Sequence, residues 1–364
     1  MNRSNRYFSP DFATVRQRFR AAVAARGGRL DSLPLAARGP RGEDLGIDIG
    51  WFGAAEPRRV FVHSSGLHGV EGYAGSAIQL QWLEQGTPVL HDGDAIVLAH
   101  MLNPYGGAWL RRVNENNVDL NRNFGAAGTR DGEPDLAYSA LDAILNPPSP
   151  PRIDFFYARA AWLLFRHGMA KIRQTVIGGQ SVNARGLFYA GDGPEAGPAA
   201  YQRYLAPRLA HAERIVAIDV HTGLGRYGGD QLLVDAALSR PQAIASMHRW
   251  FGDRVQRSDD SRVAYRAQGA QQEMYERSFA GAEIHFATQE FGTLHTVRVL
   301  AALRAENRWH HYGGGAIDHA SKRWLLAAFC PLDERWRKQV LRRGGELFAQ
   351  ACELAFATDA AADR

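Results

Sequence analysis

The chain has 364 residues, enough to bury a large hydrophobic core, and 45% of them are hydrophobic and 22% charged. This composition is typical of a globular protein and excludes a long disordered or short-period repetitive chain. The formal net charge of +5 comes mostly from scattered arginines, without a long basic run interleaved with aromatic residues, so we expect no nucleic-acid partner.

The N-terminal residues lack the apolar core of a signal peptide, and no apolar run approaches the ~20 residues of a membrane span. We therefore expect a cytoplasmic protein without a membrane partner. The oligomeric state has no signature in the sequence. Cys330 and Cys352 have apolar neighbours and form no metal pattern, which predicts that both lie in the core.

Several short, apolar, β-branched runs are bounded by turn residues, as is typical of strands buried in a sheet. The best of them cover residues 59–63, 95–99, 215–219, 231–234 and 284–287. Stretches of helical character lie between these runs. The alternation predicts an α/β fold with a mixed, mostly parallel twisted sheet flanked by helices, formed by a single domain over residues 1–364.

Two stretches have clear helical character. Residues 76–84 carry an apolar pattern that meets a stop signal at Gly86. Near the C-terminus, over about 333–357, the apolar spacing indicates one amphipathic helix, or two helices interrupted at Gly344 and Gly345.

The segment of about 126–179 differs from the core, which we place at about 45–300. It includes a proline cluster at 146–151, and residues 154–173 have the pattern of a helix rich in Phe, Trp and Leu. Its position predicts an insertion packed beside the core rather than a separate domain.

The first candidate site is Gly66-Leu-His68-Gly-Val-Glu71-Gly, directly after the run ending at His63. A histidine and a glutamate three residues apart, where a strand turns into a helix, can bind one metal ion. About one such pair is expected by chance in this sequence, but ligands of open α/β sheets do bind at strand ends. The pair is therefore a candidate metal site that needs further support.

A second polar block comprises Asn103-Pro-Tyr-Gly106, Arg112-Val-Asn114 and Val118-Asp-Leu-Asn-Arg-Asn-Phe124. A polar surface loop is the plain alternative. However, the block holds more donors than a turn needs, and guanidinium groups suit carboxylates and oxyanions.

Two later strand ends carry His221, in Asp219-Val-His-Thr-Gly-Leu-Gly225, and Glu290, in Thr288-Gln-Glu-Phe-Gly-Thr293. Either residue alone could be a buried structural group with a partner. Three other histidines beside strands are interpreted as structural, namely His63, His100 and His285. The pair His310-His311 adjoins a glycine run and could form a loop at the mouth of a site.

Taken in order, these motifs resemble the zinc metallocarboxypeptidase (M14-like) family. The segments 178–189 and 219–225 resemble more narrowly its uncharacterised bacterial branch, which is DUF2817-like. The resemblance covers roughly residues 45–300 and implies a zinc carboxypeptidase-like, phosphorylase/hydrolase-like fold. It implies one zinc ion bound by His68, Glu71 and His221, with Glu290 as the catalytic carboxylate.

The resemblance also implies roles for the polar block. Arg112 would stabilise the oxyanion, Asn121 and Arg122 would bind the substrate carboxylate, and Asp119 would orient the first histidine. From its spacing, Asp219 could orient His221 in the same way.

This sequence departs from the family pattern at Tyr105, where the family has an aspartate. The tyrosine that closes over the substrate in the family could be Tyr265, Tyr275 or neither. The insertion is expected to cover or narrow the site.

The expected function is hydrolysis of an amide bond next to a free carboxylate, as a metallocarboxypeptidase acting on short peptides. The alternative is an aspartoacylase-like deacylase, or amidohydrolase, of N-acyl amino acids, which would use the same residues. A catalytically inactive binding protein is disfavoured, because ligands, base and arginines are all present together.

Overall fold

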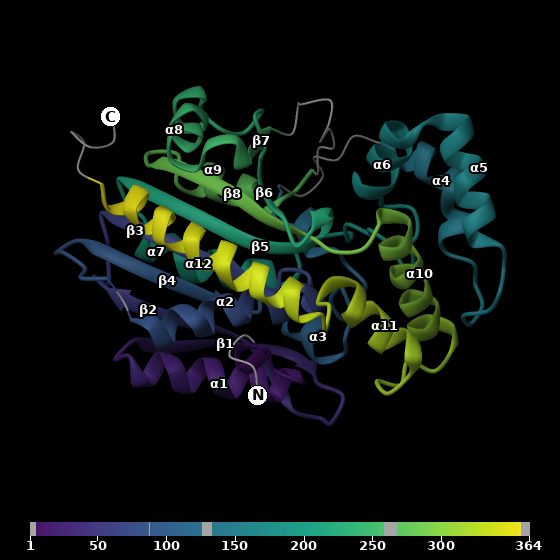
Figure 1. The fold of residues 1–364 in the computed structure, drawn as a ribbon, viewed down its shortest axis with the longest axis horizontal. Helices are drawn as coiled ribbons and strands as arrows, with labels where there is room; N and C mark the ends of the chain where they lie inside the picture. The colour runs from purple at the N-terminus through teal and green to yellow at the C-terminus, as the bar shows by residue number, and fades with distance from the viewer. Residues whose placement is uncertain (1–4, 87, 126–132, 258–267, 358–364) are drawn as a thin grey trace.

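A computed structural model describes residues 5–86, 88–125, 133–257 and 268–357, and within them one mixed sheet of eight strands has the order β1-β2-β4-β3-β5-β8-β6-β7 (Figure 1). The strands are β1 (Arg29–Arg38), β2 (Asp44–Gly53), β3 (Arg59–Ser65), β4 (Asp94–His100), β5 (Arg214–Tyr227), β6 (Asp230–Val234), β7 (Val255–Arg257) and β8 (Glu283–Gly292). Neighbours β4, β3, β5 and β8 run parallel, and so do β6 and β7. The predicted fold class is confirmed, and each predicted strand lies within β3, β4, β5, β6 or β8.

Helices cover both faces of the sheet. One hydrophobic core lies under α1 (Phe12–Ala25), α2 (Gly72–Gln85), α8 (Pro241–Phe251) and α12 (Glu334–Phe356). The other lies under α7 (Ala196–Arg208) and α9 (Gln271–Ser278). Strand β5 contributes side chains to both cores. Val216 and Ile218 face the core under α1, α2, α8 and α12, and Ile215 and Ala217 face the core under α7 and α9. No helix in the described ranges is long and apolar enough to cross a membrane.

The C-terminal helix α12 is continuous through Gly344 and Gly345, so of the two predicted forms the single helix is correct. The reason is packing against α2: a Cβ at Gly344 would lie 2.4 Å from the Ile78 side chain. Glycine allows the two helices this close approach, and the contact compensates for its weak helix propensity. At the end of α2, Gly86 is the predicted stop, with φ of 116°.

The segment predicted as an insertion forms α4 (Glu133–Leu145), α5 (Phe156–His167) and α6 (Met169–Ile177). The single helix predicted over 154–173 is wrong, because Gly168 takes φ of 78° and separates α5 from α6. Figure 1 shows these helices beside α10 (Thr296–Tyr312), which is followed by α11 (Ala320–Phe329). An apolar cluster joins the insertion to α10 and α11 and includes Val70, next to the candidate ligand Glu71.

Both cysteines are buried and free, as predicted. The short helix α3 (Pro104–Ala108) begins at Asn103, whose side chain accepts a hydrogen bond from the Gly106 N–H. The 3-10 turns are η1 (Asn5–Tyr7), η2 (Gly69–Glu71), η3 (Leu120–Arg122) and η4 (Gly252–Arg254). Turn η2 follows His68 and contains Glu71, and turn η3 contains Asn121 and Arg122.

Candidate metal centre

Three candidate ligands meet where the parallel strands end. His68 follows β3 and precedes η2, Glu71 closes η2, and His221 lies on β5. His68 Nδ1 lies 3.0 Å from Glu71 Oε1 and 3.1 Å from His221 Nδ1, and His221 Nδ1 lies 3.2 Å from Glu71 Oε2. Adjacent parallel strands therefore bring together residues that are 153 positions apart in sequence.

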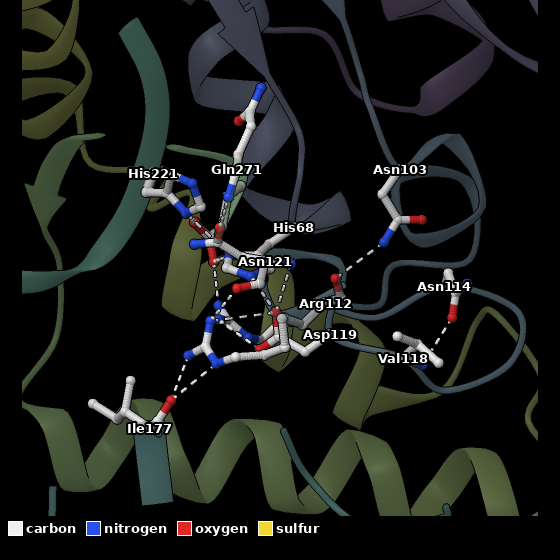
Figure 2. A network of polar contacts seen from close by, with 12 residues as sticks. His68, Asn103, Arg112, Asn114, Val118, Asp119, Asn121, Ile177, His221 and Gln271 are labelled. Atoms are coloured by element: carbon white, nitrogen blue, oxygen red, sulfur yellow. Dashed lines mark hydrogen bonds and ion pairs between the residues drawn. The ribbon is translucent and has the colours of Figure 1, made fainter. Parts of the chain in front are cut away.

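A buried aspartate orients each histidine. His68 Nε2 donates to Asp119 Oδ1 at 2.8 Å, and His221 Nε2 donates to Asp219 Oδ2 at 2.6 Å. Ser64 Oγ donates to the second oxygen of Asp219 at 2.6 Å. With each Nε2 donating its proton, each Nδ1 presents its lone pair to the point that the two histidines share (Figure 2).

This cluster fits a zinc ion. Three donors at Zn–N and Zn–O distances of about 2 Å around a tetrahedral ion lie roughly 3–3.5 Å apart, which is the spacing present here. Two imidazole lone pairs that face each other beside a carboxylate repel one another, and a cation placed between them would be stabilised by all three groups. Burial alone would lower the pKa of His221. The contacts with Asp219 and Glu71 outweigh burial and raise this pKa well above its ordinary value. Burial alone would raise the pKa of Glu71. The nearby charges of His68 and Arg112 outweigh burial and lower this pKa.

Glu290 lies on β8, in register with His221 on β5. Its side chain is buried, and Oε1 accepts a hydrogen bond of 2.8 Å from the Leu224 N–H. Burial first, and the nearby charge of Glu71 second, raise the pKa of Glu290 to about 8. A carboxyl group with such a pKa can both accept and release a proton near neutral pH.

Arg112 lies beside the cluster and contacts two of its carboxylates. Nη1 donates to Glu71 Oε1 at 2.6 Å, Nη2 donates to Asp119 Oδ2 at 3.2 Å, and the guanidinium faces the Phe188 ring at 5.5 Å. The cation is thus fixed at the edge of the metal position. From there it can offer positive charge to an oxygen atom of a substrate.

Asn121 and Arg122 occupy η3, close to the same cluster. Asn121 Oδ1 accepts from the Gln271 N–H at 3.0 Å. Arg122 is buried, and its Nε and Nη2 both donate to the Ile177 carbonyl, at 3.1 and 2.5 Å, while Nη1 donates to the Asn121 carbonyl at 2.9 Å. These contacts use three of the five N–H donors of the guanidinium. The contacts to Ile177 are drawn in Figure 2.

A cavity of about 190 Å³ adjoins the centre. Its polar lining includes His68, Glu71, Arg112, Asn121, Arg122, His221 and Glu290. Most of the remaining lining is apolar and comes from the insertion helices, α10 and Phe329. The predicted site residues thus face one cavity, except Asp119, which is buried behind His68.

Several other candidates lie away from this cavity. Tyr275 is buried and bonded to the Tyr201 hydroxyl at 2.8 Å, so it does not close over the site, and Tyr265 lies outside the described residues. The loop predicted at His310-His311 is wrong, because both residues occupy the last turn of α10.

The histidines interpreted as structural are buried, as expected. His63 lies 3.2 Å from the Gln79 side chain, His100 stacks on Phe19, and His285 contacts Glu283. None of the three lines the cavity.

Backbone donors near the carboxylates were missed by the sequence analysis. The Thr222 N–H donates to Glu71 Oε2 at 3.0 Å, and the Leu224 N–H donates to Glu290. For Leu224 the signal was available in the glycines on either side of it, because Gly223 and Gly225 take φ of 131° and 108°. These conformations favour glycine and accompany the turn that brings the Leu224 N–H to Glu290, whereas the Thr222 N–H precedes both glycines.

Comparison with known proteins gives one family match. The family described as "Protein of unknown function (DUF2817)" matches residues 8–343, in agreement with the predicted resemblance. No curated protein matches the chain.

Several solved structures are similar to the chain. Bovine thrombin-activatable fibrinolysis inhibitor, solved with tick carboxypeptidase inhibitor, is 12% identical, with 92% of this chain and 98% of that chain covered and a TM-score of 0.48. Carboxypeptidase A from Helicoverpa armigera is 14% identical, with 87% and 74% covered and a TM-score of 0.46. Murein-tripeptide amidase from Escherichia coli O157 is 18% identical, with 80% and 96% covered and a TM-score of 0.39.

Proposed function

The chain belongs to the DUF2817 family, and we propose that it is a zinc-dependent hydrolase that cleaves an amide bond next to a free carboxylate. One observation carries the proposal: the Nδ1 atoms of His68 and His221 converge with the Glu71 carboxylate, and Glu290 lies in register beside His221. Three protein ligands are typical of a catalytic zinc site, because the fourth position stays open.

In this proposal the chain's own residues move the proton and stabilise charge. When bound, zinc supplies Lewis acidity that activates a water molecule and polarises the amide carbonyl. Glu290 accepts a proton from the attacking water and returns it to the leaving amine nitrogen. Arg112 meets the negative charge that develops on the carbonyl oxygen.

The free carboxylate of the substrate would be bound by Asn121 and Arg122. The contacts of Arg122 with backbone carbonyls fix the plane of the guanidinium and leave two of its five N–H donors for a ligand. A planar donor group held in this way suits a carboxylate.

A carboxypeptidase acting on short peptides is the first candidate. The second is a deacylase of N-acyl amino acids, and the apolar lining of the cavity favours it. Both reactions use the same ligands, base and arginines, so the two candidates differ only in what lies on the acyl side of the bond.

The test begins with metal analysis of protein purified without chelator. We expect about one zinc per chain, and hydrolysis that is lost on chelation and restored by zinc. A panel of dipeptides, tripeptides and N-acyl amino acids then separates the candidates. Turnover of N-acyl amino acids alone would rule out the peptidase, and absence of stoichiometric zinc would contradict the whole proposal.

A further inference from the structure

The cavity beside the metal centre has two ends of different chemistry. One end lies toward α9 and β6, and the other toward the insertion and α10. Figure 1 shows α9 and β6 along one side of the sheet, with α4, α5, α6 and α10 grouped at one end of the molecule. An amide bond held at the metal position would therefore have a different environment on each side.

The end toward α9 is the more polar one. Its lining includes the polar side chains of Asp235, Gln272 and Thr288 beside the apolar residues Leu233, Val234, Ala270 and Phe286. Asn121, assigned above to the substrate carboxylate, accepts its hydrogen bond from Gln271 at the start of α9. The part of the substrate that carries the carboxylate, which is its amino-acid part, therefore belongs at this end.

The opposite end receives the acyl part, and its walls are almost entirely apolar. The lining there includes Leu141, Leu145, Phe156, Ala160 and Leu300, together with the polar residue Thr296 at the start of α10. Such a surface excludes charged or strongly polar groups, because they would lose their hydration without gaining partners.

Hydrogen bonds fix the insertion helices that form the apolar end of the cavity at two places, before α5 and at the end of α6. At the end of α6, the Ile177 carbonyl accepts two hydrogen bonds from Arg122. Before α5, Asp154 accepts hydrogen bonds from Arg304 and Arg308 of α10. The insertion is thus tied to the arginine beside the metal centre and to α10, and the cavity is a built feature of the fold.

The size of the cavity limits the apolar group that fits. An apolar cavity of roughly 150 Å³ is large enough to bind benzene, a ligand with six carbon atoms. The cavity of about 190 Å³ in this protein also includes the metal position and the polar end, so only part of this volume is available to the acyl part. The many apolar residues around its apolar end suit a chain longer than an acetyl group.

We propose that the apolar end of the cavity binds the acyl chain of an N-acyl amino acid, and that this chain is apolar and longer than an acetyl group. The inference rests on the proposed function and specifies its substrate. Hydrolysis breaks the C–N bond: the hydroxyl of water joins the acyl carbon, and its proton joins the amine nitrogen. The products are a carboxylic acid with an apolar chain and a free amino acid.

The first experiment measures binding without turnover. Zinc-loaded Glu290→Gln protein is titrated with N-acyl derivatives of a mixed set of L-amino acids, with acyl chains of two, four, six, eight and ten carbons. Burial of each methylene should tighten Kd by up to about fourfold until the apolar end is filled, so the optimal chain should be longer than two carbons. A flat or falling dependence of affinity on chain length would overturn the inference, whatever the hydrolytic activity.

Matched variants locate the chain in the cavity. Ala160 of α5 lines the cavity, whereas its neighbour Ala161 is exposed. Ala160→Phe should abolish the preference for eight carbons over two, and Ala161→Phe should leave it unchanged. Equal effects of the two substitutions would contradict the assignment.

A second variant tests the same assignment independently, in case Ala160→Phe fails to fold. Leu145→Ala enlarges the same end of the cavity and should move the optimum toward ten carbons. An unchanged optimum would count against the inference.

Failure of the inference is distinguishable from failure of the proposed function. If the parent protein hydrolyses dipeptides or N-acetyl amino acids without a chain-length preference, the function stands and the acyl-chain site is refuted. If no amide is hydrolysed but binding follows chain length and responds to Ala160→Phe, the site stands and the proposed reaction is wrong.

Discussion

In the candidate metal centre, His68 and His221 are each held by a buried aspartate through a hydrogen bond of 2.8 Å or less, whereas the cavity-lining side chains of the insertion make apolar contacts. The centre lies on and just beyond strands β3, β5 and β8, in the middle of the sheet. The insertion helices lie at one end of the molecule, and their outer surface includes Phe165, whose side chain is 92% exposed.

This difference separates two tasks of the site. Short polar contacts at the strand ends would orient metal ligands and a base within narrow limits, as proton transfer and metal binding require. The apolar side chains of the insertion helices shape the cavity without directional bonds of their own, so they can change while the groups of the centre stay in place. We expect substitutions in the centre to abolish the reaction and those in the insertion to change the preferred substrate.

The largest effect is expected from Glu290→Gln. The amide can neither accept the proton of the attacking water nor return it, so kcat/KM should fall by about 10²–10⁴. Zinc stoichiometry should remain that of the parent, because Glu290 is not one of the ligands. Steady-state kinetics and metal analysis measure both effects, and hydrolysis at the parental rate would show that Glu290 is not the base.

Weaker zinc binding is expected from Asp219→Asn. Loss of the carboxylate that accepts from His221 Nε2 should lower zinc affinity by about 10–100-fold, measured by competition with a chelator. Asp94→Asn is the matched control, because Asp94 is equally buried but pairs with Arg59 away from the centre. Equal losses in the two variants would mean that Asp219 acts only through stability.

A stability effect without a change in chemistry is expected from Gly344→Ala. The new methyl group would lie 2.4 Å from the buried Ile78 side chain and should destabilise the fold by about 1–2 kcal/mol. Gly345→Ala meets only the Gln81 side chain at 3.4 Å, so the gain in helix propensity should stabilise the protein by up to about 1 kcal/mol. Urea unfolding measures both, and opposite signs are the expected result.

The smallest effect is expected from Asp154→Asn, which weakens the anchor between the insertion and α10. Affinity for an eight-carbon acyl chain should fall about two- to fivefold, with affinity for an acetyl group unchanged. Glu213→Gln breaks an exposed ion pair with Arg58 and serves as the control, since exposed pairs contribute little to stability. A loss for both chain lengths would show that the insertion supports the centre itself.

Local sequence was sufficient for five strands. Four of them, β3, β4, β5 and β8, were predicted because their apolar, β-branched runs are buried on both sides of the sheet, and β6 was predicted although it is only partly buried. The strands β1, β2 and β7 were missed. β1 is an edge strand with exposed and half-buried residues in turn and with Pro34 in its middle, β2 is interrupted by Asp48 and glycines, and β7 has three residues.

The candidate ligands, base and arginines were predicted because each belongs to a short motif, at the end of a strand or in the loop after it, that resembles the zinc metallocarboxypeptidase pattern. Strand-end position depends on local chain geometry, which neighbouring residues determine.

Only the tertiary structure decided what surrounds these groups. The Arg122 contact with the Ile177 carbonyl, the pairing of Gly344 with Ile78 and the apolar end of the cavity join segments distant in sequence. A helical pattern states which residues are apolar, but not which neighbour they meet. The residues of the candidate metal centre could therefore be predicted from local motifs, whereas the shape of the adjoining cavity arises from the packing of the insertion against α10.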